Sequence, residues 1–178
     1  MTSIYAKLLG TPMVKKDTEE IIFPYGKAEA LFYYMLVKKR ASRDVLVDLF
    51  WSNITLVTAK KNLRNAVYII KKAFKEDVLV SPQRTIIELN SNIDLKLDID
   101  KFHSCIGISS IEAYSGEFLE GFYVKAAENF EEWMLTVRSE KRDAYTRKLY
   151  IEIESLLESK DWHEAERYCN KIIEIDSF

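Results

Sequence analysis

The most constraining feature of this sequence is the segment from Thr55 to Lys75, in which apolar and basic residues alternate at helical spacing. At about 100° per residue, the apolar residues fall on one face of a helix. The opposite face carries Lys, Arg, Asn and Tyr, and residues 56–75 include no acid. The chain must therefore bury one face of a long helix in a core and leave a basic face open. The buried stripe is predicted to comprise Ala59, Leu63, Ala66, Val67, Ile70 and Phe74.

The composition is that of a globular protein. The chain has 178 residues, 48% of them hydrophobic and 30% charged, and at this length it can bury a core without disulfides or metals. Cys105 and Cys169 form no CxxC pair and are expected to be small buried hydrophobes on apolar helix faces. The sequence shows neither a signal peptide nor an apolar run of membrane-spanning length. We therefore expect a cytoplasmic protein without membrane association.

The two halves of the chain differ in charge. Residues 1–97 contain 16 Lys and Arg against 10 Asp and Glu, a net charge of +6. Residues 98–178 contain 10 against 18, a net charge of −8. Such asymmetry is typical of a module that faces a polyanion joined to one that faces solvent or protein. We expect two domains, residues 1–97 and residues 98–178.

The N-terminal half combines β-forming and helical patterns. Apolar runs predict antiparallel strands at Ile4–Leu9 and Ile21–Phe23, with the polar run between them as a turn. A hairpin is predicted to pair Val78–Ser81 with Thr85–Leu89. The order strand, strand, helix, helix, helix, hairpin predicts an α+β winged helix-turn-helix. The predicted helices are Lys27–Lys39, then Arg43–Phe50 with Ser42 as N-cap, and a third from the cap Thr55 to about Lys75.

The C-terminal half is expected to be all-α. Asp100 is predicted to cap a short helix, and helical spacing runs from Glu128 to Lys160 with one break. A last helix opens at Asp161, and two antiparallel helices around this turn suggest a TPR-like hairpin. A lone repeat cannot bury its apolar face, so we expect the chain to be a fragment of a longer protein. Predicted core residues here are Trp133, Trp162, Ala165, Tyr168, Cys169, Ile172 and Ile173.

The basic face of the third helix is the candidate DNA-binding surface. An α-helix fits the major groove, where Arg and Lys bind guanine and Asn pairs with adenine. A solvated basic face is the alternative, but the preceding capped helix and the following hairpin favour DNA. Arg43 could either contact phosphate or pair with Asp44 or Asp48. The candidate DNA-binding residues are Arg43, Thr58, Lys61, Arg64, Asn65, Tyr68, Lys72 and Arg84.

Blocks of sequence along nearly the whole chain carry a family resemblance. In the first half they are Lys27–Leu31, Ser42–Leu46, Leu49–Trp51, Ala59–Val67 and Ile70–Phe74. In the second half they are Asp98–Phe102, Tyr114–Gly121, Phe130–Trp133 and Asp161–Ala165. In these blocks and their order, the chain resembles the SARP-like bacterial transcriptional activators. Members of that family join an OmpR-type winged-helix domain to a bacterial transcriptional activator domain with TPR-like helices.

The resemblance implies a function in transcription. It implies sequence-specific binding to double-stranded promoter DNA, often at direct repeats that a homodimer can occupy, and activation through contact with RNA polymerase. The loop before the recognition helix then becomes a candidate polymerase-contacting surface, with Trp51, Ser52 and Asn53 as its residues.

The sequence carries no recognisable catalytic pattern. It has no GxxxxGK[ST] loop, and His103 and His163 lie outside any HExxH frame. We therefore expect no enzymatic activity, no cofactor and no metal site. Two alternatives stay open: a helical protein-interaction adaptor whose winged helix binds protein rather than DNA, and an enzyme whose catalytic part lies outside this sequence.

Overall fold

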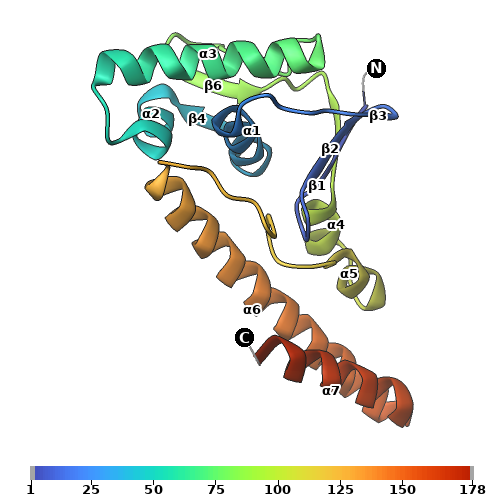
Figure 1. The fold of residues 1–178 in the computed structure, drawn as a ribbon. Coiled ribbons are helices and arrows are strands. Elements are labelled where there is room, and N and C mark those ends of the chain that lie inside the picture. Colours follow the sequence, from blue (N-terminus) through green and yellow to red (C-terminus); the bar gives the residue numbers. More distant parts are fainter. Residues whose placement is uncertain (1–2, 177–178) are drawn as a thin grey trace.

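The computed structural model describes residues 3–176, which form an α+β fold with two small sheets and a C-terminal helical region (Figure 1). Helix α3 (Leu56–Phe74) lies along one edge of the molecule. Helices α1 (Gly26–Lys38) and α2 (Arg43–Trp51) pack beneath it. The helical region extends away on the side opposite α3.

The first sheet has the strand order β3-β2-β1-β7. Strand β1 pairs antiparallel with β2 and parallel with β7. The predicted strand at Ile21–Phe23 is wrong. The antiparallel partner of β1 is β2, and both β2 and β3 lie in the segment before residue 21 that was expected to be a turn. Only Val14 of β2 is fully buried, and Phe23 instead packs its ring against Phe32 and Phe74 between the helices. The strands are β1 Ser3–Lys7, β2 Met13–Lys16, β3 Glu19–Glu20 and β7 Asp94–Leu97.

The second sheet contains the predicted hairpin. Its order is β4-β6-β5, in which β5 (Leu79–Val80) pairs antiparallel with β6 (Ile86–Leu89). Strand β4 (Arg40–Ser42), which the sequence did not predict, pairs with the other side of β6. The hairpin is therefore attached to the chain that enters α2.

The three predicted helices of the N-terminal half are confirmed. The hydroxyl of Ser42 caps α2 by accepting the Val45 N–H at 3.2 Å. Thr55 is the N-cap residue of α3, but its hydroxyl bonds to that of Thr58 at 2.9 Å instead of to the backbone. The apolar stripe of α3 is buried as predicted, except that Val67 is only half-buried.

The C-terminal half is helical, with differences from the predictions. Helix α4 (Asp98–Ser104) begins at Asp98, so Asp100 is not its cap. Short helix α5 (Ile108–Ala113) follows. Helix α6 (Glu128–Glu158) is continuous, and the predicted break is wrong. Neither Gly nor Pro occurs within α6, so nothing in the local sequence interrupts its hydrogen bonds.

Helix α7 (Trp162–Asp176) packs antiparallel on α6 and buries Ala165, Tyr168 and Ile172 (Figure 1). The prediction is wrong for Ile173, which is 63% exposed.

Three other predicted core positions lie elsewhere. Trp162, the first residue of α7, is 62% exposed, and Cys169 is also exposed. Cys105 is half-buried just after the end of α4. Trp133 is a core anchor as expected, with its ring against Tyr34, Phe118 and Phe130.

One hydrophobic core continues across residue 97. Phe50 of α2 stacks on Phe130 of α6, with ring centroids 5.1 Å apart, and Tyr34 of α1 contacts Trp133. The backbone of residues 8–10 bonds to residues 117–120. The division into domains at residue 97 stays a prediction. Among residues 3–176, no helix combines the length and apolarity needed to cross a membrane.

Candidate nucleic-acid interface

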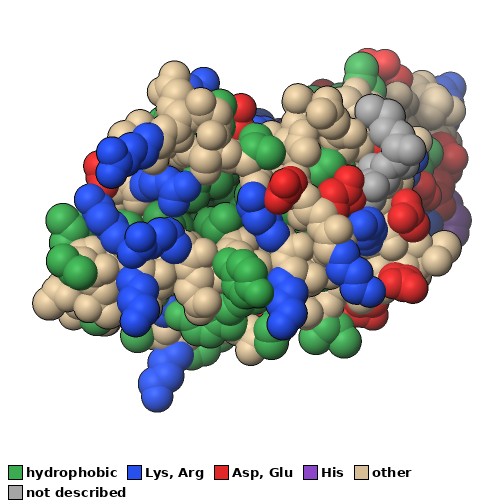
Figure 2. Space-filling model, turned by 90° about the horizontal axis from the view of Figure 1, so that it is seen from above, with side chains coloured by type: hydrophobic (Ala, Val, Ile, Leu, Met, Phe, Trp, Pro, Cys, Tyr) green, Lys and Arg blue, Asp and Glu red, His purple; other side chains and the backbone are tan. Residues whose placement is uncertain are grey.

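The outer face of α3 is open and basic. Arg64 and Lys61 are exposed at its centre, and Tyr68 is 62% exposed one turn further on. Figure 2 views the molecule from the side of α3. Lys and Arg side chains spread over this face, whereas most Asp and Glu side chains lie in the right half of the view. Thr58, Asn65 and Lys72 are also exposed. The predicted face of α3 is therefore accessible along its whole length.

Arg43 joins α2 to the hairpin. Its Nε donates to the carbonyl of Arg84 at 3.1 Å, and a terminal nitrogen donates to the hydroxyl of Ser81 at 2.9 Å. The expected alternative of an ion pair between Arg43 and Asp44 or Asp48 is not seen; Asp44 instead pairs with Lys60 at 3.6 Å. Arg43 thus fixes the hairpin loop, and the Arg84 side chain stays exposed.

A surface groove of ≈ 610 Å³ lies between the hairpin and the start of α3. Arg43, Arg64 and Arg84 line it together with Val57, and the ion-paired Asp44 and Lys60 also border it. The structure therefore brings together three predicted residues that are 20 or more positions apart in sequence. Sequence reasoning missed Val57, because a single valine carries no motif. The signal that could have found it was its position four residues before Lys61 and seven before Arg64, on the same helix face.

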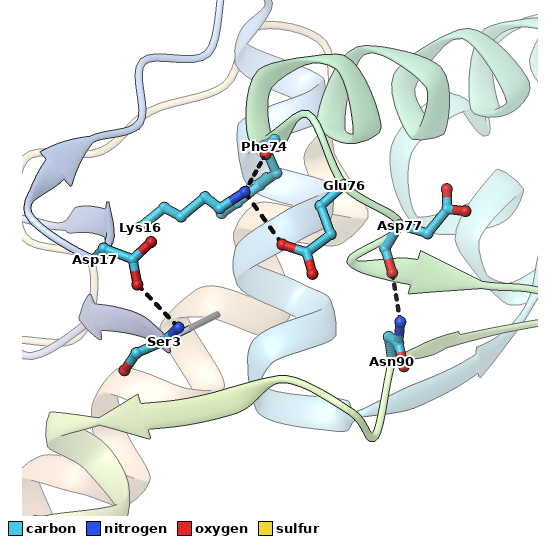
Figure 3. Close-up of polar contacts among 7 residues, drawn as sticks. All are labelled: Ser3, Lys16, Asp17, Phe74, Glu76, Asp77 and Asn90. Carbon is cyan, nitrogen blue, oxygen red and sulfur yellow. Dashed lines mark hydrogen bonds and ion pairs between the residues drawn. The ribbon is translucent and has the colours of Figure 1, made fainter. Parts of the chain in front are cut away.

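The C-terminal end of α3 is fixed by β2. Lys16 Nζ donates to the carbonyl of Phe74 at 2.8 Å and pairs with Glu76 at 3.1 Å (Figure 3). A cation at a helix C-terminus is favourable because it meets the negative end of the helix dipole and an otherwise unpaired carbonyl. Asn90 donates to the carbonyl of Asp77 at 2.8 Å and holds the following turn. These contacts fix the C-terminal end of α3 and leave its basic face unoccupied.

Replacing Lys16 by methionine is expected to lower the free energy of unfolding by about 1–2 kcal/mol, because it removes a charge-assisted hydrogen bond and the interaction with the helix dipole. Chemical denaturation followed by circular dichroism measures the loss. Lys15→Met is the matched control, since the adjacent side chain lies on the other face of β2. Equal losses in the two variants would contradict this role of Lys16.

Helix α2 is held by Lys27 of α1. Its Nζ donates to the carbonyl of Phe50 at 2.6 Å and to that of Ala126, and it lies over the ring of Trp51. Burial lowers the pKa of Lys27. Asn129 of α6 also donates to the carbonyl of Asp48 at 3.1 Å. The helix before α3 is therefore anchored to the C-terminal half.

The candidate polymerase-contacting residues divide by exposure. Trp51 is only 3% exposed, because it ends α2 with its ring against Phe50 and Lys27. It is part of the core and presents no surface to a partner. Ser52 and Asn53 are exposed in the loop that leads to α3.

The described residues contain no group of three or more His, Cys, Asp or Glu side chains placed to hold a metal ion.

Comparison with known proteins identifies a similar fold. No protein-family model and no curated protein sequence matches the chain. Among solved structures, EmbR of Mycobacterium tuberculosis, in complex with a low-affinity phosphopeptide, is similar, with a TM-score of 0.60 and 15% sequence identity. The match covers 94% of this chain and 51% of EmbR, so the chain spans about half the length of that protein. The chain therefore shares an EmbR-like α+β fold.

Proposed function

We propose that this chain is the DNA-binding part of a transcriptional regulator of the SARP-like kind. In this proposal, residues 1–97 are an OmpR-type winged helix-turn-helix and residues 98–178 begin a TPR-like bacterial transcriptional activator domain. The EmbR-like fold over 94% of the chain supports the proposal, as do the sequence blocks that resemble the family. The activity is binding, with no covalent step, cofactor or metal, and its place is the cytoplasm.

The observation that carries the proposal is the open, acid-free outer face of α3. Lys61, Arg64 and Lys72 are exposed on it beside Asn65 and Tyr68. A helix of this width fits the major groove, where Arg64 and Asn65 would contact base edges. Lys61 and Lys72 would contact phosphates and supply the salt-dependent part of the affinity.

The hairpin would clamp the DNA beside α3. Arg84 is exposed at its loop, and the bonds from Arg43 hold that loop against the start of α2. In a winged helix, such a loop reaches the neighbouring backbone or minor groove. A hairpin fixed in this way loses little conformational entropy when DNA binds.

Activation would follow from protein contacts away from the DNA. Ser52 and Asn53 are the exposed candidates for contact with RNA polymerase, and the α6–α7 pair offers a second protein-facing surface. EmbR, about half of which matches this chain, was solved in complex with a low-affinity phosphopeptide. Binding of two copies at direct repeats completes the proposed arrangement.

The proposal is tested by titrating the chain with a duplex selected from a random oligonucleotide pool, at several salt concentrations. If Lys61, Lys72 and Arg84 each neutralise one phosphate, the logarithm of the binding constant is expected to fall with the logarithm of salt concentration at a slope of about −2.7. Selection also returns the sequence motif and the spacing of its repeats.

A chain that enriches no sequence and binds duplex DNA without salt dependence would contradict the proposal. If the same chain bound a protein partner through α3, the adaptor alternative would replace it. Measurements on a scrambled duplex of equal length separate specific binding from general attraction to the phosphate backbone.

A further inference from the structure

The first turn of α3 exposes an apolar side chain beside the basic residues of its outer face. Val57 is 81% exposed and lines the groove with Arg43, Arg64 and Arg84. Its neighbour Leu56 is 57% exposed but lines a different hollow, beside Trp51 and Ile54. Val57 therefore belongs to the basic face, and Leu56 to the loop side of the helix.

Helix geometry aligns Val57 with the basic residues of α3. Lys61, Arg64 and Tyr68 follow it by four, seven and eleven residues, the spacing of one helical face. At about 1.5 Å per residue, Val57 lies roughly 10 Å from Arg64 along the helix axis. Projected on the DNA axis, that separation spans at most about three base-pair steps of 3.4 Å each. In helix-turn-helix proteins, the N-terminal residues of the recognition helix contact base edges.

We propose that Val57 determines sequence specificity by contacting the C5-methyl group of a thymine, within about three base pairs of the base that Arg64 contacts. The thymine methyl is the apolar group that the four bases display in the major groove. An exposed valine gains from covering it because both surfaces leave water. This inference rests on the proposed DNA binding and names the substrate more closely: a duplex with a preferred thymine within about three base pairs of the base that Arg64 contacts.

Arg64 and Val57 then have different tasks. The guanidinium of Arg64 binds acceptor atoms with direction, whereas the two methyl groups of Val57 recognise shape and apolar surface. A β-branched side chain is stiff in a helix, so Val57 presents its methyl groups at little entropic cost. Because the side chain is already exposed, no rearrangement of the groove is needed.

The test removes the C5-methyl group from the DNA side of the contact and the two methyl groups of Val57 from the protein side. In the selected duplex, every thymine is replaced singly by deoxyuridine, and binding is measured for the wild-type chain and for Val57→Ala. At one position, uracil is expected to weaken wild-type binding about fourfold, as expected for one buried carbon. The same replacement should leave binding by Val57→Ala unchanged. Leu56→Ala is the matched control and should keep the wild-type response to uracil.

The outcomes separate this inference from the proposed function. If Val57→Ala keeps the full response to uracil at every position, the thymine contact is overturned while DNA binding stands. The contact is also overturned if Val57→Ala binds DNA as the wild type does and loses only a protein partner. If the wild-type chain binds no duplex in a salt-dependent way, the proposed function fails first. Unchanged thermal unfolding of Val57→Ala shows that the fold is intact.

Discussion

An Arg64→Ala variant is expected to bind the selected duplex more weakly by about 1–3 kcal/mol and to lose preference at one base pair. Arg64 lies exposed at the centre of the outer face of α3, and no ion pair among the described residues holds its guanidinium. It can therefore donate two hydrogen bonds to guanine. Alanine removes both and leaves the guanine acceptors without partners. Fluorescence anisotropy with a panel of single-base variants of the duplex measures the affinity and the preference together.

Two other variants define what the Arg64 result means. Lys72→Ala should weaken all duplexes alike and lower the salt slope by about one, because it removes a phosphate contact. Arg147→Ala is the matched control: the same change at an exposed position on α6, in the acidic half. It should leave affinity unchanged. An equal effect of Arg64→Ala and Arg147→Ala would contradict the assignment of α3 as the DNA-contacting helix.

Replacing Asp98 by alanine is expected to lower the free energy of unfolding by about 2–4 kcal/mol, because it leaves buried backbone N–H groups unpaired. The carboxylate accepts from the N–H groups of Leu8 at 2.9 Å, Leu9 at 2.7 Å and Ile99 at 2.8 Å. Leu8 and Leu9 are fully buried. Burial raises the pKa of Asp98, and these three N–H groups counteract part of the rise. Urea denaturation measures the loss.

Asp100→Ala is the matched control for Asp98. Asp100 lies two residues on in the same helix, and its only ion pair among the described residues is an exposed one with Lys39 at 3.9 Å. Its removal should change the free energy of unfolding by less than about 0.5 kcal/mol. Asp98→Asn retains one acceptor oxygen and should fall between the two. A loss for Asp100→Ala as large as for Asp98→Ala would contradict the role of Asp98.

The difference in charge between the two halves of the chain corresponds to their different positions in the fold. The helical pair α6–α7 extends from the side opposite α3 (Figure 1). Acidic side chains next to bound DNA would repel it, and placing the acidic helices on the side away from α3 reduces this repulsion. Lys27 and Asn129 hold the two halves together, so the separation of charge is built into the fold.

The sequence alone predicted the elements whose pattern is local. The helix over residues 56–74 followed from a periodicity that a single segment contains, and the cap at Ser42 from a residue beside the helix it starts. The hairpin needed only two β-forming runs separated by a short turn. Such features depend on neighbours within a few positions, which the sequence displays directly.

Elements that depend on distant partners could not be predicted in this way. Strand β7 pairs with β1 across some ninety positions of sequence, and β4 pairs with β6. Asp98 rather than Asp100 is the first residue of α4, and its carboxylate accepts from the buried N–H groups of Leu8 and Leu9, which follow β1. According to the sequence alone, either acid could begin the helix. The first residue of α4 depends instead on contacts with residues about ninety positions away along the chain.

The candidate site divides in the same way. Helical periodicity determined that Lys61, Arg64 and Tyr68 point away from the apolar stripe, because direction around a helix axis is a property of the sequence. Only the tertiary structure decided which candidate residues are accessible. Trp51 is buried against Lys27, and the Arg43 side chain is hydrogen-bonded to the hairpin. A residue's direction follows from its own helix, but its accessibility depends on which other segments pack against that helix.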